Sequence, residues 1–146
     1  MIGQFGIGSA LIVLSIVIHA VFMVFAARAV RRRGTWLRQP PALPKRAGIL
    51  TAVSLWLMAS MSVTVWIWAF YFLWVGALED LETAIYFSLV SFTTLGFGDI
   101  VLAPPHRLLS GMLAANGLVL FGMTAAELLD LIRNLHAAKS DSSPDS

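Results

Sequence analysis

Residues 91–99 read SFTTLGFGD, and this stretch determines how the rest of the chain is interpreted. Gly96 and Gly98 lack a β-carbon and therefore tolerate positive φ, which other residues resist. Successive carbonyls of an ordinary strand point to opposite sides, but they turn to the same side when the sign of φ alternates. A row of carbonyl oxygens on one side can replace the water around a monovalent cation.

The stretch resembles the Thr-Val-Gly-Tyr-Gly selectivity filter of potassium channels, with Leu and Phe in place of Val and Tyr. A lone Gly-x-Gly would be a weak signal, but here the motif lies between two segments of membrane length. The resemblance covers about residues 48–135 and implies that backbone carbonyls coordinate K⁺, the conducted ion. The filter residues are Thr94, Leu95, Gly96, Phe97 and Gly98, with K⁺ at the first four of them.

Composition indicates a membrane protein. Of 146 residues, 58% are hydrophobic and 12% are charged, and the mean hydropathy is +0.81. The absence of cysteine excludes disulfides and thiolate metal sites. We predict an all-α membrane protein with three transmembrane helices, a re-entrant pore helix and a filter loop. The predicted parts are a first helix at 1–30, a basic loop at 31–47, an outer helix at 48–76, a pore helix at 82–93, a filter at 94–99, an inner helix at 106–135 and a disordered tail at 136–146.

The distribution of charge predicts the orientation in the cell membrane. Seven of the ten basic residues lie in or just before the loop at 31–47, and such loops stay in the cytoplasm. The N-terminus is then outside and the C-terminal tail is cytoplasmic. Glu79, Asp80 and Glu82 fall at the outer start of the pore helix, where we expect capping in preference to ion capture. Anionic lipid headgroups are possible partners of Arg31–Arg33, and no nucleic acid partner is expected.

The resemblance also implies a set of residues that support the filter. Tyr86 and Phe87 occupy the places of an aromatic cuff, and Thr93 and Asp99 flank the filter. The side chains of Leu95 and Phe97 are expected to pack behind it. Phe97 lacks the usual hydroxyl, Phe87 offers it no polar partner, and Val90 stands where some relatives have a buried carboxylate. We therefore expect apolar packing in place of the usual polar strut, which leaves the strictness of selectivity open.

The inner helix contains further candidates. Gly117 lies 19 residues past Gly98, close to the position of the gating hinge in related channels, and is either a hinge or a close helix contact. For Gly111 and Gly122 we favour contact. Two acidic residues, Glu127 and Asp130, are expected near the cytoplasmic mouth, where they either concentrate cations or pair with basic residues.

Two features lie in the first and second helices. His19 is an ionisable group within an apolar helix, which marks a functional candidate. A neutral histidine bonded to a neighbouring helix is favoured over a proton sensor. Trp66, Trp68 and Trp74 are expected to form an interfacial aromatic belt.

One filter strand cannot encircle an ion, so we expect a homotetramer with one filter per chain. The function that follows is a potassium-selective channel with bound K⁺ and no other cofactor. A nonselective monovalent cation channel of the same architecture and a noncatalytic membrane scaffold remain alternatives. An enzyme is not expected, because His106 and Ser110 are the nearest approach to a catalytic pair and have no third group.

Overall fold

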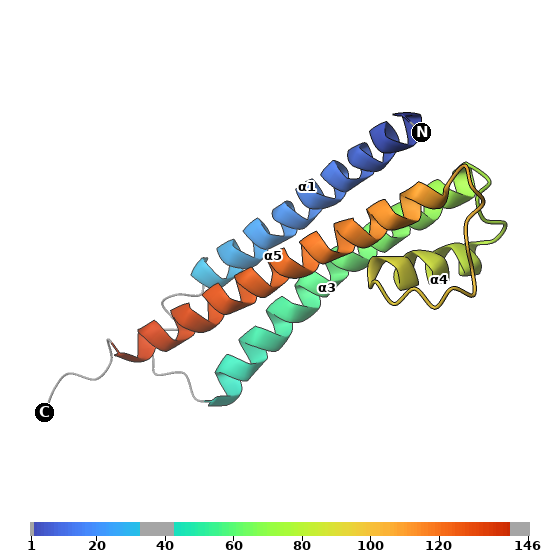
Figure 1. Ribbon diagram of the computed structural model, residues 1–146. Helices are drawn as coiled ribbons and strands as arrows, with labels where there is room; N and C mark the ends of the chain where they lie inside the picture. Colours follow the sequence, from blue (N-terminus) through green and yellow to red (C-terminus); the bar gives the residue numbers. More distant parts are fainter. Residues whose placement is uncertain (1, 33–42, 141–146) are drawn as a thin grey trace, which may run out of the picture.

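The computed structural model describes residues 2–32 and 43–140, and this part of the chain forms four helices without any strand (Figure 1). The helices are α1 (Ile2–Arg32), α3 (Leu43–Trp74), α4 (Leu81–Phe92) and α5 (Arg107–Ser140). The prediction of an all-helical protein is confirmed.

Three of these helices are long and apolar enough to cross a membrane, at Gly3–Val30, Ala47–Trp74 and Arg107–Arg133. At about 1.5 Å per residue each exceeds the roughly 30 Å of a hydrocarbon core. The 12 residues of α4 are too few to cross it. The chain is therefore a membrane protein with three spanning helices and one short helix between the second and the third.

The ends of the helices differ from the predicted bounds. α3 begins at Leu43, inside the predicted loop, and carries Pro44 in its first turn. Proline is tolerated there because the first N–H groups of a helix have no partner within the helix. α5 runs to Ser140, so the start of the predicted disordered tail is helical. The remainder of the basic loop, 33–42, and of the tail, 141–146, lies outside the described residues.

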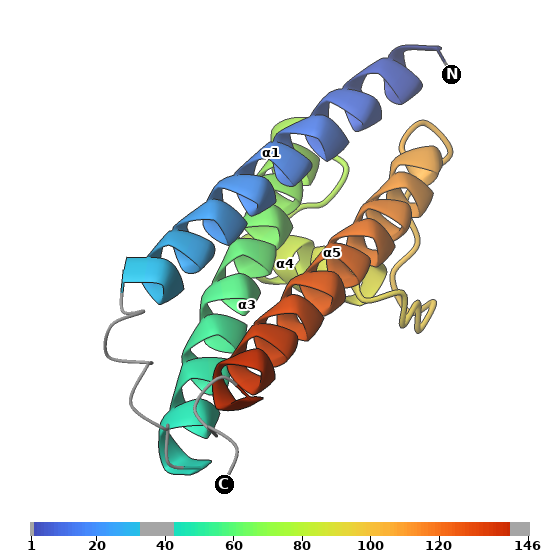
Figure 2. The ribbon, with the colours of Figure 1, turned by 90° about the vertical axis from the view of Figure 1, so that its left-hand side faces the viewer.

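The short helix lies beside the pair formed by α3 and α5, on the side away from α1 (Figures 1 and 2). α1 contacts both α3 and α5, and α4 contacts the same two helices. The chain runs in one direction along α1 and α5 and in the other along α3. Consequently the N-terminal end of α1 and the loop after α4 lie at the same end of the molecule.

Large apolar side chains fill the space between α3, α4 and α5. Phe72 of α3 meets Phe87 of α4 edge-on, with ring centroids 5.4 Å apart. Trp68 belongs to this core and is fully buried, so its predicted place in an interfacial belt is wrong. It lies one helical turn from Phe72 and shares the inward face of α3. Trp66 and Trp74 are exposed, as a belt requires.

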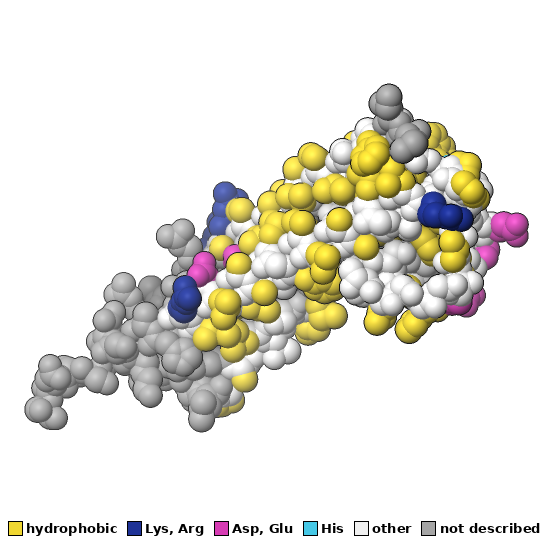
Figure 3. Space-filling model, in the orientation of Figure 1, with side chains coloured by type: hydrophobic (Ala, Val, Ile, Leu, Met, Phe, Trp, Pro, Cys, Tyr) yellow, Lys and Arg dark blue, Asp and Glu magenta, His cyan; other side chains and the backbone are white. Residues whose placement is uncertain are grey.

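The outer surface is apolar along most of its length. Between the two ends, the visible face in Figure 3 carries hydrophobic and uncharged side chains, and the charged ones gather near the ends. Such a surface suits contact with lipid, where exposed apolar groups are not in water. Examples on α1 are Val13, Val17, Val21, Val24 and Phe25.

Candidate functional site

The short helix α4 begins with a side-chain cap. Asp80 has extended backbone dihedrals, and its Oδ1 accepts a hydrogen bond from the backbone N–H of Thr83 at 2.8 Å. This bond holds the pKa of the Asp80 carboxyl below its ordinary value. The capping role expected for this residue is therefore confirmed.

The other end of α4 anchors the loop that follows it. The carbonyl oxygen of Val90 accepts from the backbone N–H of Leu95 at 3.0 Å and from that of Gly96 at 3.4 Å. The Thr93 hydroxyl donates to the carbonyl of Leu89 at 2.8 Å and reaches that of Val90 at 3.3 Å. The loop thus folds back on the last turn of the helix. Val90 supports it through its backbone, not only through its buried side chain.

The loop has the alternating backbone that the sequence predicts. Gly96 and Gly98 have φ of 54° and 78°, and Thr94 has φ of 61°. Leu95 and Phe97 are not among the residues of positive φ. The sign therefore alternates over five consecutive residues, which turns successive carbonyls to one side. Thr94 is thereby held in a left-handed conformation that a β-branched residue rarely adopts.

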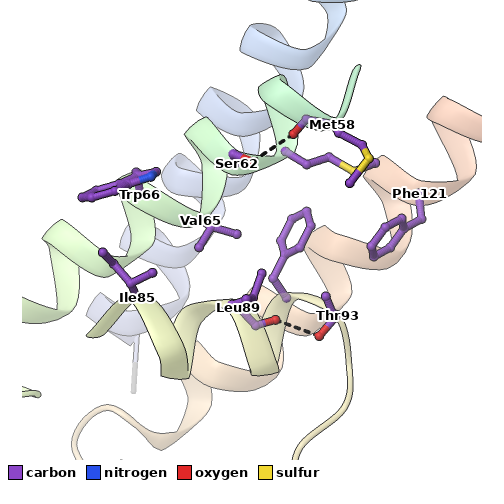
Figure 4. A pocket seen from close by; sticks show the side chains of 10 residues that line it. Met58, Ser62, Val65, Trp66, Ile85, Leu89, Thr93 and Phe121 are labelled. Atoms are coloured by element: carbon purple, nitrogen blue, oxygen red, sulfur yellow. Dashed lines mark hydrogen bonds between the residues drawn. The ribbon is translucent and has the colours of Figure 1, made fainter. Parts of the chain in front are cut away.

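A cavity of about 290 Å³ lies next to the end of α4 (Figure 4). Its walls come from α3, α4 and α5 and are almost entirely apolar. In Figure 4 the Thr93 hydroxyl is bonded to the Leu89 carbonyl, and Phe121 lies across from α4. The lining residues are Met58, Met61, Ser62, Val65, Trp66, Ile85, Leu89, Phe92, Thr93 and Phe121.

A polar strut joins α4 to the residue after the loop, contrary to the expectation of purely apolar support. The Tyr86 hydroxyl donates to Oδ2 of Asp99 at 2.7 Å. This hydrogen bond lowers the pKa of Asp99, and it raises the pKa of Tyr86 because the phenol gives up a proton less readily beside a carboxylate. Phe97 has no hydroxyl and cannot form the usual strut. The bond between Tyr86 and Asp99, which are 13 residues apart in the sequence, provides a different one.

The packing of Phe97 behind the filter stays a prediction, because one chain alone leaves this side chain exposed. Phe87 is buried against Phe72, because its side chain points toward α3. The side chains of Leu95 and Phe97 are 60% and 66% exposed. The described part of their own chain therefore leaves most of the surface of these two large apolar groups uncovered.

Gly117 makes a close contact between α5 and α4. A β-carbon at this position would lie 2.9 Å from the carbonyl carbon of Phe92, and closer still to its oxygen. Of the two roles that the sequence left open, the contact role is the one observed. Gly111 and Gly122 behave differently from our expectation, since a β-carbon on either would meet nothing within 4 Å in the described residues. Of these three glycines, Gly117 is the one that lies against α4.

The remaining candidates lie apart from the loop. Glu127 is half-buried and Asp130 is exposed, and both are near the far end of α5. Neither forms an ion pair with Arg133 in the part of the chain that the structure describes. The Ser110 hydroxyl donates to the carbonyl of Arg107 at 2.7 Å and does not engage His106.

Sequence reasoning singled out His19 but missed its partners. They are Ser60 on α3 and Thr124 on α5, polar residues in apolar helices, which was the available signal. It also missed Asn116, whose side chain is buried with neither its nitrogen nor its oxygen hydrogen-bonded among the described residues. Nothing but the polarity of Asn116 in an apolar run indicated it.

A family model described as "Ion channel" matches residues 51–134, more than half of the chain. The chain belongs to the ion channel family. The match includes α4, the loop and most of α3 and α5, and it leaves α1 outside. No curated protein and no solved structure matches the chain. Gly117, α4 and the alternating loop all lie within the matched residues.

Proposed function

We propose that this ion channel is potassium-selective and conducts K⁺ through a pore formed by four copies of the chain. The observation that carries the proposal is the alternation of φ at Thr94, Gly96 and Gly98. The carbonyls from Thr94 to Phe97 replace the water around K⁺, and Gly98 completes the filter. The hydrogen bonds that Val90 accepts fix the inner end of this row against α4.

The exposed filter side chains support assembly into a tetramer. Leu95 and Phe97 present apolar surface that a single chain leaves uncovered. One filter row provides oxygens on only one side of an ion, and a ring of four rows surrounds it. A closed fourfold ring would bury these side chains against neighbouring copies at the same time.

The end of α4 adds an electrostatic contribution. A helix carries partial negative charge at its C-terminus, which here lies at Thr93, beside the filter. In a tetramer four such ends converge and stabilise a cation before it enters the filter. Glu127 and Asp130, far along α5, then lie near the inner mouth. The positive-inside rule makes this mouth cytoplasmic, with Arg31–Arg33 near anionic headgroups.

A nonselective monovalent cation channel is the second candidate. It is favoured by Phe97, which cannot form a hydrogen bond behind the filter, and by Phe87, which is turned toward α3. The Tyr86–Asp99 bond acts in the opposite sense because it ties the outer end of the filter to α4. A permeability ratio decides between the two candidates.

The experiment is ion flux of the purified protein in liposomes, followed by the reversal potential under opposed K⁺ and Na⁺ gradients. We expect flux, with a reversal potential near that of K⁺. Gly96→Ala should abolish it while the assembly still forms, because φ of 54° strains any side chain although the space beside it is open. Gly111→Ala is the matched control, since it adds a methyl group in open space without a positive φ. Unchanged conduction in Gly96→Ala would contradict the filter assignment.

A further inference from the structure

The helix α1 lies outside the family match, yet it holds a polar group at the centre of the bundle. His19 is fully buried, and its ring lies where α1 meets both α3 and α5. Nδ1 is 2.6 Å from Oγ of Ser60, and Nε2 is 3.2 Å from Oγ1 of Thr124. We call these three residues the His19 clasp.

The direction of the hydrogen bond between His19 and Ser60 follows from the second bond that Ser60 forms. Ser60 donates its hydroxyl proton to the carbonyl of Leu57 at 2.7 Å, so its oxygen must accept from His19. Nδ1 of His19 therefore carries a proton. In the neutral ring that a membrane interior favours, Nε2 then has a free lone pair that accepts from the Thr124 hydroxyl. The neutral imidazole uses both nitrogens in this way, which is the arrangement that a membrane interior tolerates.

The other contacts between α1 and α5 are apolar. Near one end, a β-carbon at Gly8 would lie 2.6 Å from Cε of Met112 and 3.2 Å from Cδ2 of Leu109. Near the other end, Ala26 and Leu131 belong to one buried apolar cluster. Apolar contacts are non-directional and permit small shifts. The clasp is the directional link between α1 and α5 in the described residues.

α5 is thereby fixed at two levels. Gly117 lies against the carbonyl of Phe92 at the end of α4, which carries the filter. Thr124 follows seven residues later, about two helical turns or 10 Å along the axis, and is held by His19. If the part of α5 that follows Gly117 moves relative to α1 and α3, the hydrogen bond between Thr124 and His19 must break or re-form.

We propose that His19 is a positioning residue of the pore, and that its clasp sets the equilibrium between the conducting and nonconducting arrangements of α5. The proposal rests on the proposed channel function. α1 acts as a brace that favours the arrangement described here. A hydrogen bond between membrane helices changes such an equilibrium by about 3- to 20-fold when it is lost.

The test is a double-mutant cycle on open probability, recorded from single channels in planar bilayers. His19→Phe removes both hydrogen bonds at similar size, and Thr124→Val removes the hydroxyl at constant shape. Each should shift the ratio of open to closed time about 3- to 20-fold in the same direction. The double variant should shift it no further than the larger single one. Conductance of the open channel should not change. Additive shifts, or none, would overturn the proposal.

Two further variants test whether hydrogen bonding by the clasp causes the shift. His19→Gln keeps a donor and an acceptor, so the variant should have the open probability of the wild type. Because Gln cannot take up a proton, this open probability should not change with pH. If it behaves as His19→Phe, hydrogen bonding is not the cause. Ser15→Ala is the matched control, since Ser15 is also buried in α1 but donates within its own helix, to Leu11. Should His19→Phe not assemble, Ser60→Ala and Thr124→Val each remove one of the two bonds of His19, and each alone should shift the ratio of open to closed time in the same direction. No shift in either variant would overturn the proposal.

A measurement independent of conduction keeps the two proposals apart. Nitrogen NMR of the labelled wild-type protein should show His19 with a proton on Nδ1 only, and Thr124→Val should shift the Nε2 signal. A wild-type protein without ion flux would contradict the channel. An unshifted Nε2 signal in a conducting protein would contradict the clasp.

Discussion

At the scale of single residues, the filter loop is a strained backbone held by a few directional bonds. Thr94 adopts a left-handed conformation, for which side chains incur a cost that glycine avoids. The bonds accepted by Val90 hold one end of the loop, and the Tyr86–Asp99 bond holds the other. Such strain persists only where the surroundings fix the conformation from both ends.

The Tyr86–Asp99 bond should make the outer end of the filter sensitive to acid. The pKa of Asp99 is lowered by the bond, so the stabilisation is present above the ordinary carboxyl range and is lost as pH falls through the lowered pKa. The pKa of Tyr86 is raised, so the same stabilisation is lost again when the pH rises through that value. At neutral pH the bond is intact.

We therefore expect Tyr86→Phe to lower the protection of the amides of residues 96–100 against hydrogen exchange at neutral pH, measured relative to their intrinsic exchange rates. The loss of this protection at acid pH, expected in the wild type, should be absent in the variant. Tyr71→Phe is the control, because the Tyr71 ring packs against Phe72 and Trp74 and its hydroxyl has no hydrogen bond among the described residues. If Tyr86→Phe leaves exchange at these amides as in the wild type, the strut has no role in holding the loop.

Asn116 should lower the stability of the conformation described here. Its amide is buried with no hydrogen bond among the described residues, and a buried polar group without a partner costs about 1–3 kcal/mol. Asn116→Leu keeps a similar volume and should raise the free energy of unfolding by about that amount, measured by thermal or denaturant unfolding in detergent. A loss of stability instead would mean that the assembled channel supplies the amide with a partner.

At the scale of helices, α4 is positioned by backbone contact as much as by side chains. Gly117 allows α5 to touch the last turn of α4, one residue before Thr93. The inner helix and the filter are therefore in direct mechanical contact. Any substitution at Gly117 acts on both.

Gly117→Ala should destabilise the assembly and disturb the filter, because the added methyl overlaps a backbone carbonyl that cannot rotate away. Overpacking of this kind costs about 1–3 kcal/mol. Gly122→Ala is the control: its methyl meets open space, and alanine favours the helix by up to about 1 kcal/mol. Thermal dissociation of the two variants measures the difference. Unchanged stability with reduced open probability would restore the hinge interpretation.

The elements could be predicted from sequence more fully than their contacts. Hydropathy and length identified the three spans, and the glycine spacing identified the loop, because both depend on local chemistry. The partners of His19 lie 41 and 105 residues away and depend on how the helices pack. The burial of Trp68 did have a local signal. Met61, Val65, Trp68 and Phe72 repeat at helical spacing along one face of α3.

At the scale of the whole molecule, three spans place the start of α1 and the end of α5 on opposite sides of a membrane. The N-terminal end of α1 and the filter loop lie at the same end (Figures 1 and 2). This relation follows from the fold alone. Which side faces the cytoplasm depends instead on the basic residues around the segment 31–47.

Both statements can be tested with single cysteines, since the chain has none of its own. A reagent that cannot cross the membrane should label Gly3→Cys and Asp80→Cys in intact cells. Thr35→Cys, in the segment outside the described residues, should be labelled only after permeabilisation. The arrangement of helices requires Gly3 and Asp80 to be on the same side in either orientation, so labelling on opposite sides would contradict the fold. Labelling of Thr35 alone in intact cells would leave the fold intact and invert the orientation, which would place the acidic start of α4 in the cytoplasm.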